Sequence, residues 1–450
     1  MPQFAAAAWS SSSKGNTEIC TAAGQQSSPL IVSDGAGGAI ITWEDARNVH
    51  FDIFSQRIDT QGNTLWAKDG IPVCTAPENQ TRPKVISDGN GGAIITWQDI
   101  RNGYNNSDIY AQRIDAAGKP QWIENGVPVC TAVNAQNSPC IASDGEGGAI
   151  IIWQDFRTNY ADLYAQRITK EGEVLWKKNG DLVCGASGAQ SAPVAVDDGK
   201  GGVIFAWQDF RRSFADIYAQ RIDNSGKVLW EKGGVPICTA LGHESFQVIV
   251  GNGSEGATIA WIDTRNGNND IFAQQIDGNG NIRWKVNGIP VCKKPGNQDY
   301  PVITDNGAGG VILSWWDKRS GAYGIYAQHI DRDGNALWAE DGLAISAEKG
   351  IQNNVNIVSN GTGGAILTWN DNRKDPAFDV YVQQIDKDGL MQWIGSGVAC
   401  STAPDTQCFP VLVTDSAGGV IIAWQDARNR DRSYWDIYAQ RINKEGSLGE

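Results

Sequence analysis

GGAIITWQDIR, residues 91–101, is the stretch that decides the fold, because it recurs with small changes eight times along the chain. Its tryptophans are spaced 54, 56, 54, 54, 54, 54 and 55 residues apart; they are Trp43, Trp97, Trp153, Trp207, Trp261, Trp315, Trp369 and Trp424. A nearly constant period of this length is typical of a propeller or a solenoid, in which each repeat packs on the next. The repeat runs almost from end to end, so we expect residues 1–450 to form one closed domain.

The repeat at residues 82–130 reads as four short strands. Residues 83–86 are a short apolar run, and residues 87–92 form a Gly-rich turn. Residues 93–97 are almost entirely apolar, which indicates a strand covered on both faces. Residues 109–114 and 127–130 complete the unit, and Pro128 suits an edge strand because proline cannot donate to a ladder. Four antiparallel strands repeated radially predict an all-β fold, an eight-bladed β-propeller.

The two ends of the chain indicate how the ring closes. The eighth repeat, residues 410–447, lacks its fourth strand. Trp9 and residues 19–22 resemble residues 66 and 73–76 of the first repeat. We therefore expect residues 9–22 to supply the outer strand of the last blade, a closure that joins the two ends of the chain and resists unwinding.

Composition excludes several classes of partner. The net charge of −14 and the pI of about 4.8 disfavour nucleic acid, which requires a basic surface. No segment approaches the roughly 20 apolar residues of a membrane span, so we expect no membrane insertion. Residues 1–8 lack the basic and long apolar regions of a signal peptide. A monomer is the default expectation.

Most cysteines follow the repeat. Seven of the nine are interpreted as occupying one position in successive repeats, with Ser346 at that position in the remaining one, which predicts small buried side chains. Cys140 and Cys408 are out of register, and their pairing with Cys130 and Cys400 stays open. The seven are Cys20, Cys74, Cys130, Cys184, Cys238, Cys292 and Cys400.

The turn DTQGNTLW, residues 59–66, resembles the Asp-box hairpin of sialidase-like propellers. The resemblance implies an aspartate that caps the turn and an aromatic ring packed between blades. It does not imply sialidase activity, because no arginine triad can be assigned; most copies also carry an extra residue between Asp and Gly, and Thr169 and Asn443 replace two of the aspartates. The whole repeat resembles arrays in secreted or surface bacterial proteins of unassigned function, so we expect a secreted or cell-surface protein.

Two sets of repeated polar residues favour structure over chemistry. The first is a turn position at which Asp and Asn interchange, which suits a hairpin turn better than a calcium site. It comprises Asp34, Asp88, Asp144, Asp198, Asn252, Asn306, Asn360 and Asp415. Residues 331–335, DRDGN, look like a calcium loop but are one copy of the hairpin at residues 59–66, which in most copies lacks the second aspartate. The three histidines are too dispersed for a zinc site, so we expect neither a metal nor a cofactor.

The second set is an Asp-x-Arg pair after the second strand of every repeat. An active site is usually built once, so eight copies favour a structural loop clamp; a ligand pocket in each blade is the alternative. The pairs are Asp45 and Arg47, Asp99 and Arg101, Asp155 and Arg157, Asp209 and Arg211, Asp263 and Arg265, Asp317 and Arg319, Asp371 and Arg373, and Asp426 and Arg428.

The candidate functional residues are those at which one repeat differs from the others. Two tryptophans per blade leave Trp316 and Trp435 over, and both map to the face that carries the loops between second and third strands. Blade 6 also departs from the repeat at Gly324 and His329. The candidate ligand-binding residues are Trp316, Trp435, Tyr434, Tyr323, Tyr300 and His329. The alternative for the aromatic residues is that they cap the grooves between blades.

Aromatic platforms beside amide and guanidinium groups suit sugars or peptides. The leading hypothesis is a non-catalytic binding or interaction module with a glycan or polypeptide on this face. One alternative is a carbohydrate-active enzyme, a lyase or glycoside hydrolase, that uses unrepeated carboxylates; the candidates are Glu78, Glu244, Asp299, Asp375 and Asp431. Another is an architectural spacer.

Overall fold

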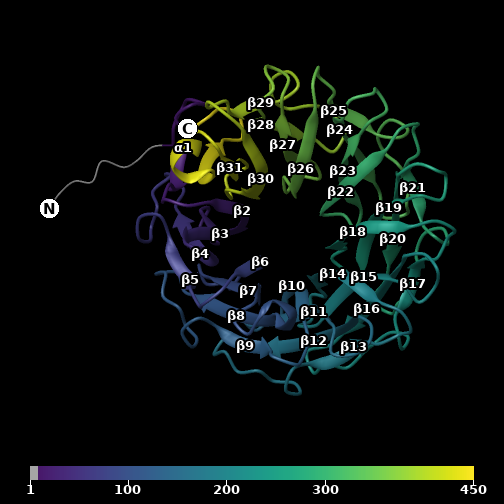
Figure 1. Cartoon of the computed structure of the whole chain (residues 1–450). Coiled ribbons are helices and arrows are strands. Elements are labelled where there is room, and N and C mark those ends of the chain that lie inside the picture. The colour runs from purple at the N-terminus through teal and green to yellow at the C-terminus, as the bar shows by residue number, and fades with distance from the viewer. Residues whose placement is uncertain (1–8, 450) are drawn as a thin grey trace.

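The computed structural model describes residues 9–449, which form a ring of eight antiparallel four-stranded blades (Figure 1). Blade 1 comprises β2 (Gln26–Ser33), β3 (Ala39–Asn48), β4 (His50–Ile58) and β5 (Ile71–Cys74); blade 2, β6 (Gln80–Ser87), β7 (Ala93–Asp99), β8 (Asp108–Ile114) and β9 (Val127–Cys130). Blade 3 comprises β10 (Gln136–Ser143), β11 (Ala149–Asp155), β12 (Asp162–Ile168) and β13 (Asp181–Cys184); blade 4, β14 (Gln190–Asp197), β15 (Val203–Asp209), β16 (Asp216–Ile222) and β17 (Val235–Cys238).

Blades 5 to 8 repeat this order. Blade 5 comprises β18 (Glu244–Gly251), β19 (Ala257–Asp263), β20 (Asp270–Ile276) and β21 (Ile289–Cys292); blade 6, β22 (Gln298–Asp305), β23 (Val311–Asp317), β24 (Gly324–Ile330) and β25 (Leu343–Ser346). Blade 7 comprises β26 (Gln352–Ser359), β27 (Ala365–Asp371), β28 (Asp379–Ile385) and β29 (Val398–Ser401); blade 8, β30 (Gln407–Thr414), β31 (Val420–Asp426), β32 (Asp436–Ile442) and β1 (Thr17–Cys20). The predicted eight-bladed β-propeller is confirmed.

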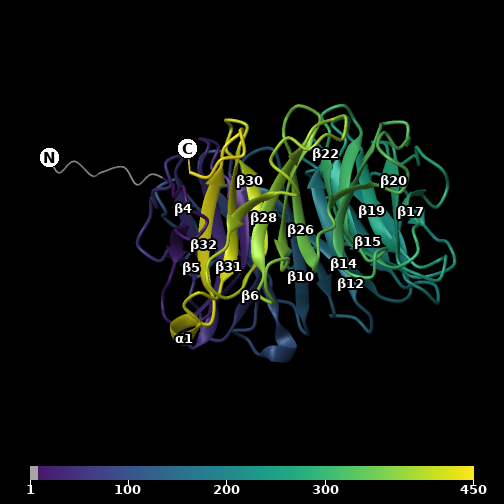
Figure 2. The ribbon, with the colours of Figure 1, turned by 90° about the horizontal axis from the view of Figure 1, so that it is seen from above.

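The first strand of each blade lines the centre, and the fourth lies on the rim (Figure 1). We call the face with the turns between first and second strands the turn face, and the face with the loops between second and third strands the loop face. A 3-10 helix, η1 (Tyr104–Asn106), and a short helix, α1 (Arg430–Ser433), belong to the loop face (Figure 2). Within residues 9–449, no helix has the length and hydropathy of a membrane span.

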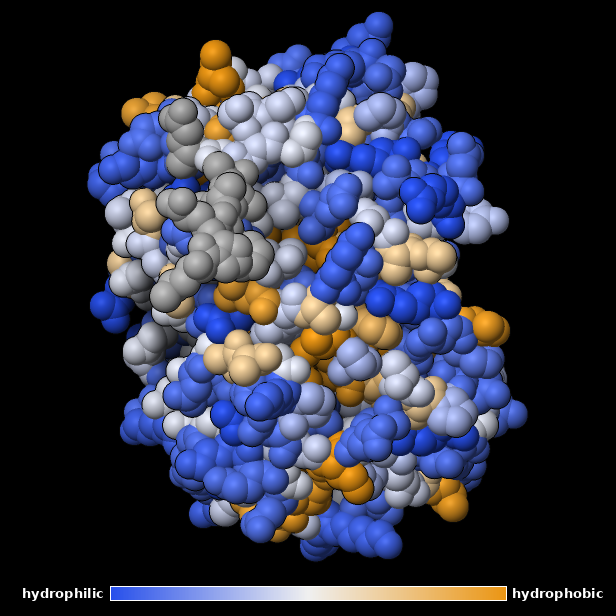
Figure 3. Space-filling model, turned by 90° about the vertical axis from the view of Figure 1, so that its left-hand side faces the viewer, coloured by the Kyte–Doolittle hydropathy of each residue, from blue (hydrophilic) through white to orange (hydrophobic). Residues whose placement is uncertain are grey.

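The hydrophobic core lies between blades, because each sheet is covered on both faces by its neighbours. Between blades 1 and 2, Ile40, Ile53 and Trp66 pack against Ala93, Ile95 and Trp97. The tryptophan of each repeat phrase is fully buried. This explains why the second strands are apolar throughout instead of alternating. The outer surface near the closing blade is mostly hydrophilic, with small separate hydrophobic areas (Figure 3).

The N-terminal segment closes the ring as expected. Strand β1 pairs with β32, and Trp9, Ile19 and Cys20 pack into the core between blades 8 and 1. The Nε1 of Trp9 donates to the carbonyl of Thr60 at 2.9 Å, across the junction. The first and last segments of the chain therefore share one blade.

Each Asp-x-Arg pair forms an ion pair, and its arginine reaches the preceding blade. In blade 2, Arg101 donates to Oδ1 and Oδ2 of Asp99 at 2.8 and 2.6 Å, and Trp97 Nε1 donates to the same carboxylate at 2.8 Å. Arg101 also donates to the Sγ of Cys74 in blade 1 at 3.3 Å and lies over the ring of Tyr110. Corresponding ion pairs occur in all eight blades.

These contacts correct the cysteine alignment. In blade 7, Ser401 pairs with Val380, as Cys74 pairs with Ile53 in blade 1, so Ser401 and not Cys400 is equivalent to Cys74. The repeated position thus holds six cysteines and two serines. The serines are Ser346 and Ser401, to which Arg373 and Arg428 donate. All nine cysteines, which lie within the described residues, are buried free thiols, and neither of the two pairings left open is formed.

The interchange of Asp and Asn at the turn position follows its partner. Asp34 accepts from the backbone N–H groups of Ala36 and Gly38, both at 2.8 Å, and from Arg57 at 2.9 Å. Arginine occupies the Arg57 position wherever the turn has Asp. The three Asn turns belong to blades 5, 6 and 7, where that position holds Gln275, His329 and Gln384. A neutral partner therefore accompanies a neutral turn residue, which avoids an unpaired buried charge.

The turn at residues 59–66 is capped by its aspartate. Asp59 Oδ1 accepts from the backbone N–H groups of Gln61 and Asn63, both at 2.9 Å. Trp66 packs between blades and donates to the carbonyl of Ala116 in blade 2 at 3.2 Å. At residues 331–335, Asp331 likewise accepts from the backbone N–H groups of Asp333 and Asn335.

Candidate functional site

All eight inner strands carry the same backbone distortion near the loop face. One residue per strand has a φ of +50 to +55°, and the pairing register with the second strand shifts there. The eight are Ser28, Arg82, Ser138, Ala192, Phe246, Tyr300, Asn354 and Phe409. We call them the bulge ring, because each is the extra residue of a β-bulge.

This backbone conformation is strained. None of the eight residues is glycine, and six of them precede proline, which disfavours helical conformations in the residue before it. Each such outlier costs on the order of 1–3 kcal/mol and persists only where the surrounding structure imposes it. Because the distortion recurs in all eight blades it belongs to the scaffold, and it places one side chain of each blade at the mouth of the central channel.

The bulge ring is identical in backbone but unequal in side chains. Blades 5, 6 and 8 contribute Phe246, Tyr300 and Phe409, whereas blades 1 to 4 contribute small or charged residues. The aromatic side borders a hollow of about 520 Å³, which we call the aromatic pocket. Phe246, Tyr300 and Phe409 are 52, 43 and 52% exposed, although their rings are apolar. A cluster of exposed aromatic side chains on a rigid scaffold is typical of a binding surface.

Four aromatic rings form a continuous series at this pocket. The ring centroids of Phe246 and Tyr300 lie 4.8 Å apart, those of Tyr300 and Trp316 4.3 Å, and those of Trp316 and Tyr323 6.0 Å. Tyr323 is fixed from behind, because its hydroxyl donates to Asp299 Oδ2 at 2.7 Å. Burial, followed by this carboxylate, raises the pKa of Tyr323 to about 12, so the phenol stays protonated. The Tyr323 end of the series is thus held in place by a hydrogen bond.

The polar lining of the aromatic pocket is neutral. Gln247, Asn354, Asn356, Gln425 and Ser28 contribute amides and a hydroxyl, and among residues 9–449 those that line it include no charged side chain. Some of these groups are already oriented: Gln425 Oε1 accepts from the backbone N–H of Ser28 at 2.8 Å, and Gln247 Nε2 donates to the carbonyl of Ala192. The pocket can therefore stack a ring and offer hydrogen bonds, without a charge to pair.

The other side of the channel mouth has a different character. A neighbouring hollow of about 650 Å³ is lined by Arg82, Lys84 and Glu44 among others. Glu44 Oε1 accepts from the backbone N–H of Arg82 at 2.7 Å, and burial raises the pKa of the Glu44 carboxyl. Deeper in the channel, residues from all eight inner strands enclose a mostly apolar space of about 490 Å³. Among the described residues that line these two hollows at the mouth, the charged ones belong to blades 1 and 2.

Of the six residues singled out by sequence, three meet at this pocket. Trp316 and Tyr300 line it, and Tyr323 packs edge-on against Trp316. Trp435 and Tyr434 do not line it; they follow α1 in blade 8, where the carbonyl of Trp435 accepts from the backbone N–H of Gln26. That position is equivalent to Tyr323, whose carbonyl accepts from Gln352 in the same way. The capping alternative thus fits Trp435 better than Trp316.

His329 lies at the opposite end of blade 6. Trp316 pairs with Ile325, whereas His329 pairs with Ile312, toward the turn face. His329 Nε2 accepts from Asn306 Nδ2 at 2.8 Å, and its Nδ1 donates to the carbonyl of Lys387 at 3.2 Å. Burial lowers the pKa of His329, which keeps the imidazole neutral. His329 thus occupies the position that Arg57 has in blade 1, and it is separated from the aromatic rings.

Sequence reasoning missed Phe246, Asn354 and Phe409. The inner strands were read as regular short apolar runs, whereas each contains a bulge that turns one side chain toward the channel mouth. A signal was present: an Xaa-Pro pair recurs at one register in six of the eight repeats, such as Tyr300-Pro301 and Phe409-Pro410. Aligned on that pair, the variable Xaa position would have indicated the ring.

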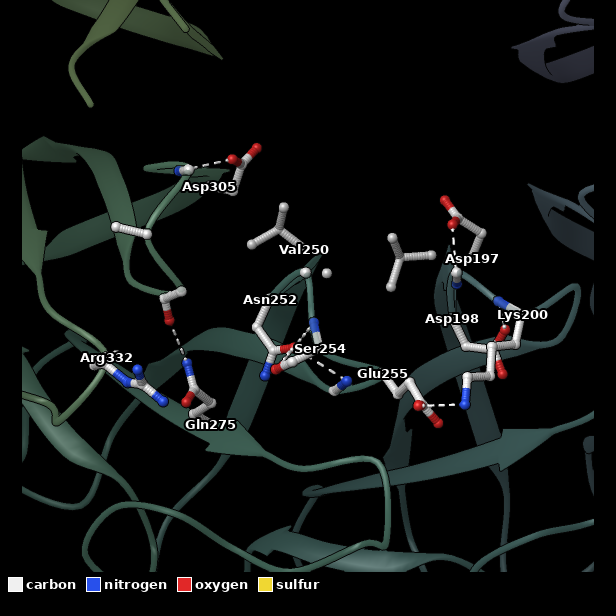
Figure 4. Close-up of a pocket in the computed structure, with 18 residues that line it drawn as sticks. Asp197, Asp198, Lys200, Val250, Asn252, Ser254, Glu255, Gln275, Asp305 and Arg332 are labelled. Atoms are coloured by element: carbon white, nitrogen blue, oxygen red, sulfur yellow. Dashed lines mark hydrogen bonds and ion pairs between the residues drawn. The ribbon is translucent and has the colours of Figure 1, made fainter. Parts of the chain in front are cut away.

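A second large hollow, of about 890 Å³, lies at the turn face between blades 4, 5 and 6 (Figure 4). Part of its charge is paired: Glu255 pairs with Lys200 at 2.5 Å and with Arg221 at 3.2 Å. Asp197 and Asp305 accept from the backbone N–H groups of Gly199 and Gly307. These contacts stabilise the turns, so this hollow is a weaker candidate than the aromatic pocket.

The five unrepeated carboxylates do not line the aromatic pocket. Asp299 is engaged by Tyr323 and by Asn269 Nδ2 at 2.6 Å, and Glu244 is fully buried between blades 4 and 5. Glu78 lies 4.0 Å from His50, Asp375 accepts from the backbone N–H of Ala377, and Asp431 belongs to α1. The structure therefore does not assemble them into one acid pair at this site.

Comparisons with known proteins give structural likeness only. No protein-family model matches the chain, and no curated protein matches it. Solved structures that resemble it include a Hadza microbial sialidase, Hz136 (14% identity, 75% of this chain and 74% of that one, TM-score 0.35). A Mycobacterium tuberculosis puromycin-hydrolyzing peptidase is 12% identical over 94% of this chain and 62% of that one, with a TM-score of 0.48. A Penicillium chrysogenum alpha-L-arabinanase complexed with arabinobiose is 11% identical over 70% of this chain and 94% of that one, with a TM-score of 0.37. At these identities the likeness concerns the fold alone.

Proposed function

We propose that this protein is a non-catalytic binding module that holds a neutral glycan in the aromatic pocket. The observation that carries the proposal is the juxtaposition of exposed, pre-positioned aromatic rings with an uncharged amide lining. Sugar rings present C–H faces that pack on aromatic rings, and hydroxyls that exchange hydrogen bonds with amides. A pocket of about 520 Å³ lies within the usual range for small-ligand sites.

The neutral lining favours a glycan over a polypeptide. A polypeptide segment presents backbone N–H and C=O groups that need a strand edge or a dense set of partners. Each inner strand leaves one edge toward the channel, but a bulge distorts that edge at the pocket, where side-chain amides are offered instead. A secreted or cell-surface location, where free glycans occur, is consistent with this proposal and stays a prediction.

Arrays of neutral glycans and of peptides, probed with the wild type and with Trp316→Gln, test the proposal. Glutamine occupies the Trp316 position in four other blades, so the variant keeps a residue that the repeat tolerates. We expect binding to neutral oligosaccharides that the variant loses. Binding to peptides alone would contradict the glycan assignment, and cleavage of a bound glycan would favour the enzyme alternative. No binding to either array would favour the spacer.

A further inference from the structure

The interface between blades 4 and 5 carries one more carboxylate than the other interfaces between blades. The first residue of the inner strand is glutamine in seven blades: Gln26, Gln80, Gln136, Gln190, Gln298, Gln352 and Gln407. In blade 5 it is Glu244, which has no exposed surface. Six of the seven glutamines donate their amide to backbone carbonyls of the preceding loop, as Gln190 donates to Ala186 and Gly188 at 3.3 and 3.1 Å, and Gln352 donates to Asp371 Oδ1 at 3.5 Å instead. A carboxylate at this position has no hydrogen to donate.

The oxygens of Glu244 lack partners in a site that holds other acids. Among the described residues, none forms a hydrogen bond with Oε1 or Oε2 of Glu244, and none with either carboxylate oxygen of Asp216 in blade 4. Asp216 is 1% exposed, and its nearest cation is Arg212 Nε at 3.6 Å. Two buried carboxylates without hydrogen bonds are costly unless a cation or a proton accompanies them.

The same place brings a thiol within reach. One ligand atom each of Cys238, Glu244 and Asp263 lies within 4.8 Å of the other two, and all three residues are buried. Arg265 donates to Cys238 Sγ at 3.1 Å and to Asp263 Oδ2 at 2.5 Å. Residues 239–243, which connect Cys238 to Glu244 at the loop face, include the 78% exposed Leu241, so the site lies directly beneath an accessible loop.

We propose that Cys238, Glu244 and Asp263 bind one divalent transition-metal ion of the zinc class between blades 4 and 5. Thiolate and carboxylate oxygen together are a donor set that Zn²⁺ accepts, with bonds of about 2.0–2.3 Å, and water can complete a tetrahedron. Binding releases the Cys238 proton to solvent, and Arg265 then donates to the thiolate. The sequence suggested no metal here because Cys238 and Asp263 recur in other blades. Glu244 is what distinguishes this interface.

The simpler alternative is that Glu244 keeps a proton and imitates glutamine. Burial, with Asp263 and Asp216 adding to it, raises the pKa of Glu244 to about 8. A protonated carboxyl supplies the missing donor for Glu244, and Asp216 gains no hydrogen bond in either state. A metal ion neutralises the whole group. The two states are distinguished by whether Zn²⁺ stays with the protein.

The test measures zinc retained by the full chain after EDTA treatment, reloading with Zn²⁺ and dialysis. We expect about one Zn²⁺ per chain, with a matching rise in Tm. Glu244→Gln, which installs the residue of the seven other blades, should abolish both effects, as should Cys238→Ser. Cys74→Ser is the matched control, because Cys74 has the same arginine contact beside Gln80, and it should retain zinc.

Two results would overturn the proposal. Equal zinc content in the wild type and Glu244→Gln would show that Glu244 is a protonated structural residue. Retention of zinc by Cys238→Ser at the wild-type level would remove the thiolate from the site. Because serine occupies the Cys238 position in two other blades, that variant is expected to fold, and its own Tm verifies this.

Discussion

The rings of Tyr300 and Trp316 lie with their centroids 4.3 Å apart, although the two residues belong to different strands, β22 and β23. Tyr300 is presented by the strained bulge of β22, and Trp316, near the end of β23, stands where the other blades have glutamine, asparagine, glutamate or isoleucine. Two departures from the repeat thus meet at one point of the channel mouth. The glycan-binding proposal depends on this pair.

Arg101→Ala should destabilise the protein without affecting the aromatic pocket. It leaves the fully buried Asp99 with Trp97 Nε1 as its remaining side-chain donor, and it removes the contacts with Cys74 and Tyr110. Breaking one partner of a buried ion pair costs about 3–5 kcal/mol. Urea unfolding should show this loss, whereas an exposed substitution such as Lys119→Ala should not. An unchanged unfolding midpoint would contradict the clamp interpretation.

The turn pairs should be exchangeable only together. Arg57→Gln leaves the buried Asp34 without its cation and should cost about 2 kcal/mol. The double variant Asp34→Asn/Arg57→Gln reproduces the pair found in blades 5 and 7, so it should recover much of that loss. A double-mutant cycle by urea unfolding measures the coupling. Strict additivity of the two single changes would show that the residues are not a functional pair.

Deletion of residues 1–22 should open the ring. The deletion removes β1 with the buried Trp9 and Ile19, and it leaves β32 as an unpaired edge. We expect a lower Tm and concentration-dependent aggregation. A synthetic peptide of residues 9–22 added to the truncated protein should raise the Tm again. Identical Tm values for the full and truncated chains would contradict closure by this segment.

Glu244 should make the stability of the metal-free protein depend on pH. Its pKa is about 8 in the folded state, against about 4.5 for the ordinary carboxyl. From pH 4.5 to 8 the unfolded chain releases this proton while the folded protein retains it, so stability falls through this window and levels off above it. In EDTA, the Tm difference between Glu244→Gln and the wild type should therefore widen from pH 5 to 8. A constant difference would mean that the environment of Glu244 does not hold a proton.

The sequence predicted the architecture well because the physics of the repeat is local. The apolar second strands and the Asx-Gly turns define eight repeats. The incomplete last repeat predicts that residues 9–22 close the ring. The cysteine alignment was wrong by one residue in blade 7, because VACS aligns with IPVC only when Ser401 takes the cysteine's place. The spacing held the signal, because this position lies 23 residues before the tryptophan of the next phrase in the other repeats, and Ser401, not Cys400, lies 23 residues before Trp424.

The site was predicted only in part. Trp316, Tyr300 and Tyr323 were found because they break the period, and they do meet. His329 also breaks the period, but it lies far from Trp316. Trp316 pairs with Ile325, and His329 is four residues farther along that strand, near the opposite end of the short blade. Phe409 was missed because a residue before proline is expected to be extended, and Phe246 was missed because it has the equivalent position in blade 5. Both residues adopt a positive φ instead.

The most direct test of the account compares the affinity of a neutral oligosaccharide, identified on the array, for the wild type, Trp316→Gln and Trp435→Gln. The account predicts at least a tenfold loss for Trp316→Gln, equivalent to about 1.4 kcal/mol, because an aromatic platform of the pocket is removed. Trp435→Gln, outside the pocket, should bind as the wild type does. Calorimetric titration measures all three. Equal affinity of the wild type and Trp316→Gln, with both proteins folded, would contradict the assignment of the aromatic pocket as the binding site.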